Sequence, residues 1–486
     1  MIRFQQKDAY ETTLRNGYKL LPFKFTKLRG NDYVATNLAG EYVVLSRSTI
    51  QKLVELGLEP SSEEYKTLKV KHFLIDEDSG IAPELLALKW RTKLAGLSDF
   101  TSLHMMVVTL RCEHSCPYCQ VSRRSNDKTA FDMSMETAVK SLDLIFKSPS
   151  PHLKIEFQGG EPLINFQLIR FIVEQARRRN ESLKKDLQFV VATNLALIDS
   201  EILEFCRTHR ILISTSLDGP KALHNKNRPR PGGNSHEKAT DGIRLAMAEL
   251  GKDYVSALMT TTKESLTQVE NIVDEYIRLG LGGIFLRPMS PYGFAMKTNS
   301  YAAYKDEEWL EFYFKGLDYI IGINLDGFRF VEHYASLVLT KMLTPYSTGY
   351  VDLMNPSGIG IAAAVYNYDG GVYASDEGRM LAEMGDRKFL LGNVHTNSYR
   401  EIFSSETLLE PLESSFTSSV PMCGECAFES YCGAEPVFHY ATQGDFVGHK
   451  PTSKFCNRNM AIFRRLISLM EDDPKIKDVF LSWIRT

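Results

Sequence analysis

Three cysteines in one short stretch, RCEHSCPYCQ, carry the clearest chemistry in this chain of 486 residues. Cys112, Cys116 and Cys119 are separated by three and two residues, so their thiolates can converge on one inorganic centre. An iron–sulfur cube has four irons, and three thiolates leave one iron open to bind and polarise another molecule. A zinc site that His114 completes is the alternative interpretation of the same loop.

A second group of cysteines lies near the C-terminal end. Cys423, Cys426 and Cys432 occur in CGECAFESYC at spacings of two and five, and Cys456 follows in SKFCNRN. Four thiolates are enough to close a metal site, and clustered cysteines in a long chain indicate metal binding more often than disulfides. Cys206 stands alone on the apolar side of an expected helix, so we expect it in the core.

The elements that position the first loop are apolar runs that alternate with amphipathic segments from residue 104 onward. The runs are HMMVVTL, KIEFQ, LQFVVATN, ILISTSLD, YVSALMTTT and GIFLRPM. Short buried runs separated by helical patterns predict βα units with a parallel sheet. Six units are visible, two fewer than in a full (β/α)₈ barrel. The first cysteines directly follow the first run, at the sheet edge where such folds place their active sites.

Different patterns flank this region. Strand-like YVATN and EYVVL, with capped helices in STIQKLVELG and PSSEEYKTL, predict a small N-terminal unit that is winged-helix-like. After residue 350 the sequence indicates a β-hairpin around NYDGG and then a loop-rich stretch. We therefore predict three domains, at 1–98, 99–325 and 326–486.

Composition excludes some partners. The net charge of −3 and pI near 6.4 provide no bulk attraction to nucleic acid or to anionic membranes. No apolar run approaches the roughly 20 residues that span a bilayer, and the first residues lack the apolar region of a secretory signal. We expect a cytoplasmic protein without nucleic-acid or membrane partners.

The first cysteine loop, on a six-unit βα barrel, resembles that of the radical S-adenosylmethionine (radical SAM) superfamily, and QGGEP at 158–162 matches its Gly-Gly-Glu-Pro stretch. The resemblance implies an α/β fold with a partial (β/α)₆, TIM-like barrel. It also implies that a [4Fe–4S] cluster on the three cysteines binds S-adenosylmethionine at its open iron. The reduced cluster then splits the cofactor, and the resulting 5′-deoxyadenosyl radical removes hydrogen from carbon.

The same resemblance points to residues that bind the cofactor. Glycine lets backbone approach a ligand closely, and the Glu161 carboxylate can accept hydrogen bonds from an ammonium group. Ser216 and Arg228 are candidates for the carboxylate and ribose, while Tyr118 could contact the adenine or pack over the cluster. The candidates are Tyr118, Gly159, Gly160, Glu161, Asn194, Ser216 and Arg228.

The C-terminal cysteines resemble the SPASM region of radical SAM peptide maturases, which usually has seven cysteines and two auxiliary clusters. Here Pro436 stands where that pattern has another cysteine, and the hairpin region NPSGIGIAAAVYNYDGGVYASDEG has none. The four remaining thiols match one complete ligand set. We predict a SPASM/twitch-like domain with one auxiliary [4Fe–4S] cluster and no open iron, and zinc remains the alternative.

The whole chain is similar to the radical SAM maturase of His-Xaa-Ser systems, especially in TSLHMMVVTLRCEHSCPYCQVSR, SPSPHLKIEFQGGEPLINF and GDRKFLLGNV. The subgroup implies a ribosomally made precursor with His-Xaa-Ser repeats and a second radical SAM maturase. A reducing donor such as flavodoxin or ferredoxin would supply electrons.

The bond that is made is open at this level. Oxidative cross-linking is favoured over epimerisation, because epimerisation often needs a free thiol and only Cys206 is uncommitted. The alternatives are a sulfatase-type maturase that makes formylglycine, a peptide epimerase, an RNA-modifying radical enzyme, and a zinc-scaffold protein that only binds peptides.

Overall fold

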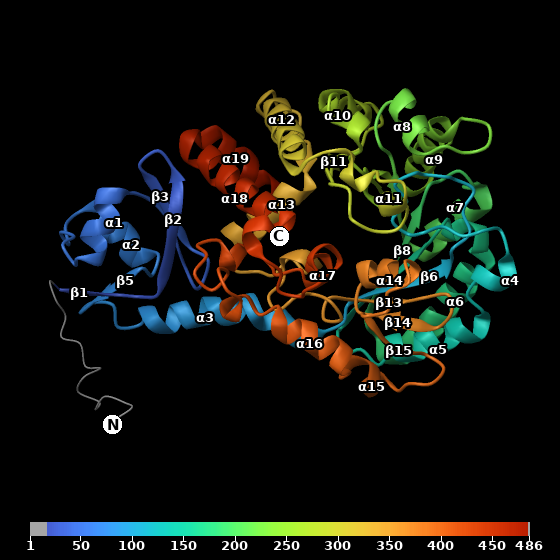
Figure 1. Cartoon of the computed structure of the whole chain (residues 1–486), viewed down its shortest axis with the longest axis horizontal. Helices are drawn as coiled ribbons and strands as arrows, with labels where there is room; N and C mark the ends of the chain where they lie inside the picture. Colours follow the sequence, from blue (N-terminus) through green and yellow to red (C-terminus); the bar gives the residue numbers. More distant parts are fainter. Residues whose placement is uncertain (1–16, 485–486) are drawn as a thin grey trace. The chain divides into compact units, whose positions relative to one another are not determined.

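The computed structural model describes residues 17–484, which form two compact units (Figure 1). The first unit comprises residues 17–96, 338–348 and 418–432, and the second comprises 97–337, 349–417 and 433–484. Within 17–484, no helix has the length and apolar character to cross a membrane. The predicted boundaries treat each domain as one continuous segment, whereas the first unit is assembled from three.

The first unit is built on two antiparallel sheets. One contains β2 (Phe23–Arg29), β3 (Asp32–Asn37) and β4 (Tyr42–Ser46), and the other pairs β1 (Tyr18–Leu20) with β5 (Leu74–Asp76). Its helices are α1 (Arg47–Val54), α2 (Glu63–Val70) and α3 (Ala82–Leu94).

Local sequence accounts for the predicted elements of this unit. The Ser46 hydroxyl accepts a hydrogen bond from the Thr49 N–H at 3.1 Å, and Ser62 caps α2 in the same way. Strands β3 and β4 and helices α1 and α2 are therefore as predicted, while β1, β2 and β5 were missed.

Residues 418–432 belong to the first unit because of specific buried contacts. The Tyr431 hydroxyl donates to the Gly40 carbonyl at 2.7 Å, and the Thr36 hydroxyl donates to the Ala427 carbonyl. Tyr431 is fully buried. A segment far along the chain thus completes the packing of β3.

The second unit contains an eight-stranded mixed sheet in the order β10-β9-β8-β7-β6-β13-β14-β15. Five neighbouring strands are parallel and correspond to the first five predicted runs. They are β6 (Leu103–Thr109), β7 (His152–Gly159), β8 (Asp186–Thr193), β9 (Ile211–Ser216) and β10 (Val255–Leu258).

Helices alternate with these strands. They are α4 (Lys128–Phe131), α5 (Met135–Ile145), α6 (Phe166–Leu183), α7 (Ser200–His209), α8 (Lys221–Asn227), α9 (Ser235–Leu250), α10 (Val269–Arg278), α11 (Phe294–Lys297) and α12 (Asp306–Leu325). The amphipathic segments predicted α5, α6, α7, α9, α10 and α12, whereas the short helices α4, α8 and α11 were not predicted. The core between sheet and helices is aliphatic and aromatic, and Cys206 on α7 is buried in it as expected.

The sixth predicted strand differs from the other five. Only β11 (Gly283–Ile284) forms, and it pairs with β12 (Val331–Glu332) in a separate two-stranded parallel sheet. A hydrogen bond from the Thr261 N–H to the Arg287 carbonyl, 2.9 Å, connects the two regions. Glycines before the strand and Pro288 after it explain its shortness, because glycine weakens a strand and proline lacks the N–H that a ladder needs.

The hairpin after residue 350 extends the barrel sheet. Strand β13 (Ala363–Tyr366) pairs in parallel with β6, and β14 (Gly371–Tyr373) and β15 (Leu390–Asn393) continue antiparallel. The remaining helices are α13 (His333–Leu343), α14 (Asp376–Glu383), α15 (Tyr399–Phe403), α16 (Glu406–Ser414), α17 (Pro436–Gln443), α18 (Lys454–Asp472) and α19 (Pro474–Trp483).

Candidate functional site

The first cysteine loop leaves the sheet at the end of β6 and is held by distant segments. The Ser115 N–H donates to the Pro229 carbonyl at 2.7 Å, and the Phe294 N–H donates to the Cys119 carbonyl at 2.7 Å. Arg111, next to the first cysteine, donates from Nε and Nη2 to both oxygens of Asp132, each at 2.7 Å. A bidentate pair of this kind fixes direction as well as distance, so the loop has a defined course.

The three thiols of this loop are half-buried. Burial raises the pKa of the Cys116 thiol to about 12, so a thiolate here depends on a bound metal. Within 17–484, one group of candidate ligand atoms lies mutually within 4.8 Å, and it is Cys112, Glu113 and His114. The three sulfurs do not form such a group, as one tetrahedral zinc would require, whereas a cube places its thiolates on separate irons.

The end of β7 lies directly against the start of this loop. The Gly160 N–H donates to the Thr109 carbonyl and the Glu161 N–H to the Arg111 carbonyl, both at 2.8 Å. A Cβ at Gly160 would lie 2.3 Å from the Arg111 oxygen, and one at Gly159 would lie 2.0 Å from the Thr109 oxygen. The immediate neighbour of Gly159 is therefore the backbone at the end of β6, and that of Gly160 is the backbone at the start of the cysteine loop.

Glu161 connects the ends of β7 and β8. Its buried carboxylate accepts hydrogen bonds from the Thr193 hydroxyl at 2.6 Å, the Asn194 N–H at 2.7 Å and the Leu163 N–H at 3.0 Å. Burial, followed by the neighbouring Glu113 carboxylate, raises the pKa of Glu161 to about 7. The Asn194 amide in turn donates to Glu113 at 2.9 Å, so the network returns to the cysteine loop.

Asp218, just after β9, organises a second polar group. It accepts hydrogen bonds from Arg228 at 3.1 Å and from the Tyr118 hydroxyl, and the Arg228 guanidinium lies 5.5 Å from the centre of the Tyr118 ring. Burial alone would raise the pKa of Asp218, but Arg228 holds it below its usual value. Tyr118 and Arg228 are thus both engaged by one carboxylate.

The strand ends also carry polar groups without protein partners. Glu113 Oε2 and Thr215 Oγ1 are buried and form no hydrogen bond, and within the described chain the Ser216 hydroxyl forms none either. Buried polar atoms are normally satisfied, so the two buried atoms fit a polar ligand beside the cysteine loop, and the half-buried Ser216 hydroxyl can also bind one. Three soft thiols and this polar rim suit a cluster together with a polar cofactor.

The C-terminal cysteines are half-buried thiols in two segments. The Cys426 N–H donates to the Cys423 carbonyl at 3.0 Å and the Cys432 N–H to the Phe428 carbonyl at 3.1 Å, so tight turns connect the first three. Cys456 lies in the first turn of α18, where its N–H donates to Ser453 Oγ at 3.2 Å. The shared auxiliary cluster on these four remains a prediction.

Two functional candidates were missed by sequence reasoning. Asp218 is the last residue of the predicted run ILISTSLD, and this position at a strand end was the available sign of its role. Glu113 lies between two of the clustered cysteines, where nothing in the spacing distinguishes it from a solvated loop residue.

Residues 106–276, which contain the cysteine loop and both polar groups, match the radical SAM superfamily. The chain contains a radical SAM domain. Domains of this superfamily use a [4Fe–4S] cluster and S-adenosylmethionine.

Two curated relatives extend the comparison beyond the radical SAM domain. An uncharacterised protein of Methanocaldococcus jannaschii is 29% identical over 189 residues, which are 38% of this chain and 62% of that protein. The chain therefore spans less than two thirds of this relative. A cysteine-type anaerobic sulfatase-maturating enzyme of Clostridium perfringens is 24% identical over 341 residues, which are 66% of this chain and 84% of the enzyme.

Solved structures share the fold. Native anSMEcpe with bound AdoMet aligns with a TM-score of 0.63 and 20% identity, covering 79% of this chain and 99% of that chain. SuiB of Streptococcus suis, bound to its precursor peptide SuiA, aligns with a TM-score of 0.50 and 14% identity, covering 86% and 95%. The protein thus has the radical SAM α/β fold, with a mixed sheet and a C-terminal region that aligns beyond the barrel.

Proposed function

We propose that Cys112, Cys116 and Cys119 hold a [4Fe–4S] cluster and that the protein modifies a polypeptide by radical chemistry. When bound, the cluster and S-adenosylmethionine supply a 5′-deoxyadenosyl radical that removes a hydrogen atom from carbon. The observation that carries this proposal is the fixed cysteine loop, enclosed by the Glu161 and Asp218 networks at adjacent strand ends.

We further propose distinct roles for the residues around the loop. Ser216 has a hydroxyl without a protein partner, so it can bind the cofactor directly. Glu161 and Asn194 place polar groups beside Glu113, where they can contact the cofactor. Gly159 and Gly160 allow the end of β7 to approach the loop closely enough for these contacts. Asp218 binds both Arg228 and Tyr118, so we propose that its carboxylate orients these two side chains toward the cofactor.

For the second cysteine group we propose one auxiliary [4Fe–4S] cluster on Cys423, Cys426, Cys432 and Cys456. The cysteine spacing supports it, together with a fold that aligns along most of SuiB and the sulfatase-maturating enzyme. Four thiolates leave no open iron, so this cluster would transfer electrons or stabilise the fold.

The proposed substrate is a ribosomally made precursor, of the His-Xaa-Ser type, in the cytoplasm. Two similar proteins support a polypeptide substrate, since one matures sulfatases and the other is bound to a precursor peptide. Oxidative cross-linking is the proposed outcome, with two hydrogens lost per bond. A second radical SAM maturase and a flavodoxin or ferredoxin donor complete the proposed system.

Metal content and product mass test this proposal together. Anaerobically reconstituted protein should contain about eight irons per chain, and Cys116→Ala should lose about half of them and stop forming 5′-deoxyadenosine. Cys206→Ala is the matched control, because that thiol is buried in the core and lies outside both cysteine clusters of the sequence. Zinc without iron in the wild-type protein would contradict the proposal.

Mass spectrometry of a co-expressed precursor identifies the reaction. Cross-linking should remove two hydrogens and join two residues into one fragment. Formylglycine is the second candidate, which the alignment to the sulfatase-maturating enzyme over 341 residues favours. Its product would be an aldehyde on a single residue, with loss of sulfur if cysteine is the target. An unchanged mass with inverted chirality would indicate epimerisation.

A further inference from the structure

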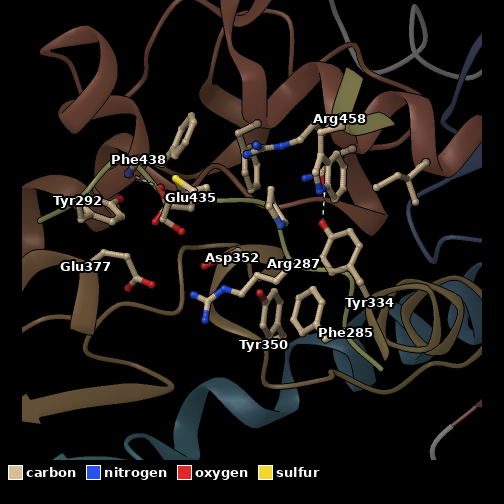
Figure 2. A pocket seen from close by; sticks show the side chains of 17 residues that line it. Phe285, Arg287, Tyr292, Tyr334, Tyr350, Asp352, Glu377, Glu435, Phe438 and Arg458 are labelled. Atoms are coloured by element: carbon tan, nitrogen blue, oxygen red, sulfur yellow. Dashed lines mark hydrogen bonds between the residues drawn. The ribbon is translucent and has the colours of Figure 1, made fainter. Parts of the chain in front are cut away.

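A cavity in the second unit lies outside the cysteine loop and its polar networks. It has a volume of about 80 Å³, enough for several waters or the end of one side chain. Asp352, Glu377 and Glu435 line it together with Arg287, and we call it the carboxylate pocket. Figure 2 shows these four side chains turned toward a common space.

The carboxylate pocket has an excess of negative groups. Three carboxyls face one guanidinium, and the other lining arginine, Arg458, is paired with Asp306 at 3.5 Å. Burial, followed by the Asp352 carboxylate, raises the pKa of Glu377 to about 7. Burial and the neighbouring carboxyls both oppose ionisation of Glu377, so a cation bound beside it would stabilise its charged form.

A buried hydroxyl provides an independent sign of a ligand. Tyr292 is 1% exposed, lines the pocket, and its hydroxyl has no hydrogen-bond partner. Its pKa is raised by burial and then by Glu435, Glu377 and Asp352, which places the hydroxyl in the field of the pocket carboxyls. Leaving a buried hydroxyl without a hydrogen bond destabilises the folded protein, and a polar group bound in the pocket would provide the missing partner.

The carboxylates of the pocket come from separate segments of the second unit. Glu377 lies in the hairpin region and Glu435 directly precedes Pro436, the two segments where the SPASM resemblance would place further cysteines. Both segments contribute a carboxylate to the cavity, and that of Glu435 also accepts a hydrogen bond from the Phe438 N–H.

The lining favours an organic cation over a metal ion or an anion. Within 17–484, Asp352, Glu377 and Glu435 are not among the ligand groups within 4.8 Å of one another, so their spacing exceeds that of one ion's ligands. Aromatic rings form another wall, where Phe285 stacks on Tyr334 with centroids 5.7 Å apart. Carboxylates combined with aromatic faces suit a cationic side chain.

The carboxylate pocket is connected to the cysteine loop through the chain itself. Tyr292 precedes Gly293 and Phe294, and the Phe294 N–H donates to the Cys119 carbonyl at 2.7 Å. Two residues span at most about 7 Å, so the wall of the pocket begins beside the loop where the radical would form.

We propose that the carboxylate pocket binds a cationic side chain of the polypeptide substrate, a guanidinium, ammonium or imidazolium group, and so anchors the peptide near the cysteine loop. This inference rests on the proposed function for the polypeptide nature of the ligand. The recognition itself requires no turnover.

Binding of matched peptides tests the inference. Acetylated, amidated Gly-Ala-X-Ala-Gly peptides with X as arginine, lysine, histidine, norleucine or glutamate are titrated into the reconstituted protein and followed by peptide NMR. At least one cationic peptide should bind about tenfold tighter than the norleucine peptide. Glu377→Gln should weaken that binding about fivefold, roughly one ion pair's contribution, while Glu307→Gln, an exposed carboxylate on α12, should not.

Other outcomes overturn the inference. A cation site would be excluded if the norleucine peptide bound as tightly as the cationic peptides, or if the glutamate peptide bound more tightly. It would also be excluded if Glu377→Gln left the binding of the cationic peptides unchanged. Binding of Mn²⁺ that is lost in Glu377→Gln, without peptide binding, would assign the pocket to a metal. If Glu377→Gln does not fold, Asp352→Asn is tested in its place. The comparison of the five peptides on the wild-type protein tests the inference without any variant. Formation of 5′-deoxyadenosine is measured separately, so failure of the proposed function remains distinguishable.

Discussion

Glu161 is the residue at which three parts of the candidate site meet. Its backbone N–H binds the cysteine loop, and its carboxylate binds Thr193 and Asn194 at the end of β8. Three donors face a carboxylate that burial and Glu113 push toward protonation. The balance between these effects makes the stability of the site sensitive to pH.

The sign of this pH dependence follows from the raised pKa. The carboxyl titrates near 4.5 when unfolded and near 7 when folded, so the folded state binds the extra proton between these values. Its contribution to stability is complete below pH 4.5 and is lost as the pH rises to about 7. The unfolding free energy of the wild-type protein minus that of Glu161→Gln should therefore fall by about 3 kcal/mol across this window.

Urea unfolding at several pH values, with both proteins in the same state of iron loading, measures this difference. Subtracting the variant removes the titration of all groups that the two proteins share. A constant difference would mean that folding does not change the pKa of Glu161, and a difference that rises with pH would mean that the three donors lower it.

Residue types and spacing predicted part of the site and left the rest hidden. Cysteine clusters and QGGEP are visible because their chemistry is rare and their spacing is local. The hydrogen bond between Tyr118 and Asp218 joins residues 100 positions apart in the sequence. A single sequence gives no information on how close such residues lie in space. The carboxylate pocket was hidden for the same reason, since its acids are ordinary residues that only folding brings together.

At the scale of elements, the approach of β7 to the cysteine loop depends on glycine. The register of β6 and β7 shifts between Val107 and Thr109, where the loop departs from the sheet. Gly160 then packs against loop carbonyls that belong to the backbone and cannot rotate away. Close approach of two backbones is a recognised use of glycine in strands.

A methyl group at Gly160 should therefore separate the two segments. Gly160→Ala places a Cβ 2.3 Å from the Arg111 carbonyl oxygen, and we expect a loss of about 2–4 kcal/mol in unfolding free energy, with reduced iron in the cysteine loop. Gly282→Ala is the matched control, since nothing lies within 4 Å of its added Cβ. Chemical denaturation and iron analysis provide the two measurements. Equal stability of both variants would show that the segments separate without cost.

Elements with strong local patterns were predictable, and those defined by distant pairing were not. The five long parallel strands have continuous apolar runs, and their helices have clear amphipathic periods. The sequence around β11 is apolar, yet only two of its residues pair with another strand. The short partner β12, the flanking glycines and the proline limit its length. Likewise, the hairpin sequence predicts a turn but contains no indication that β13 pairs with β6.

At the scale of the whole molecule, the first unit is assembled from segments far apart in sequence. Residues 418–432 contain three of the C-terminal cysteines and contact β3 and its following turn through Ala427 and Tyr431. The predicted boundaries at 1–98 and 326–486 therefore place residues 418–432 and β3, which pack together, in different domains. Deleting residues 17–96 would therefore also remove the residues against which the segment 418–432, with its three cysteines, packs.

Hydrogen exchange can show whether this unit opens as one. Amides of 17–96 and 418–432 should share one opening free energy, distinct from that of β6–β10, because cooperative units follow packing and not sequence order. Tyr431→Phe removes the bond to the Gly40 carbonyl and should lower the opening free energy of both segments by about 1 kcal/mol. Tyr319→Phe, which removes an exposed bond to Asp274, should leave them unchanged. If 418–432 instead exchanges with 433–484, the cysteine segment folds with the second unit and the discontinuous unit is wrong.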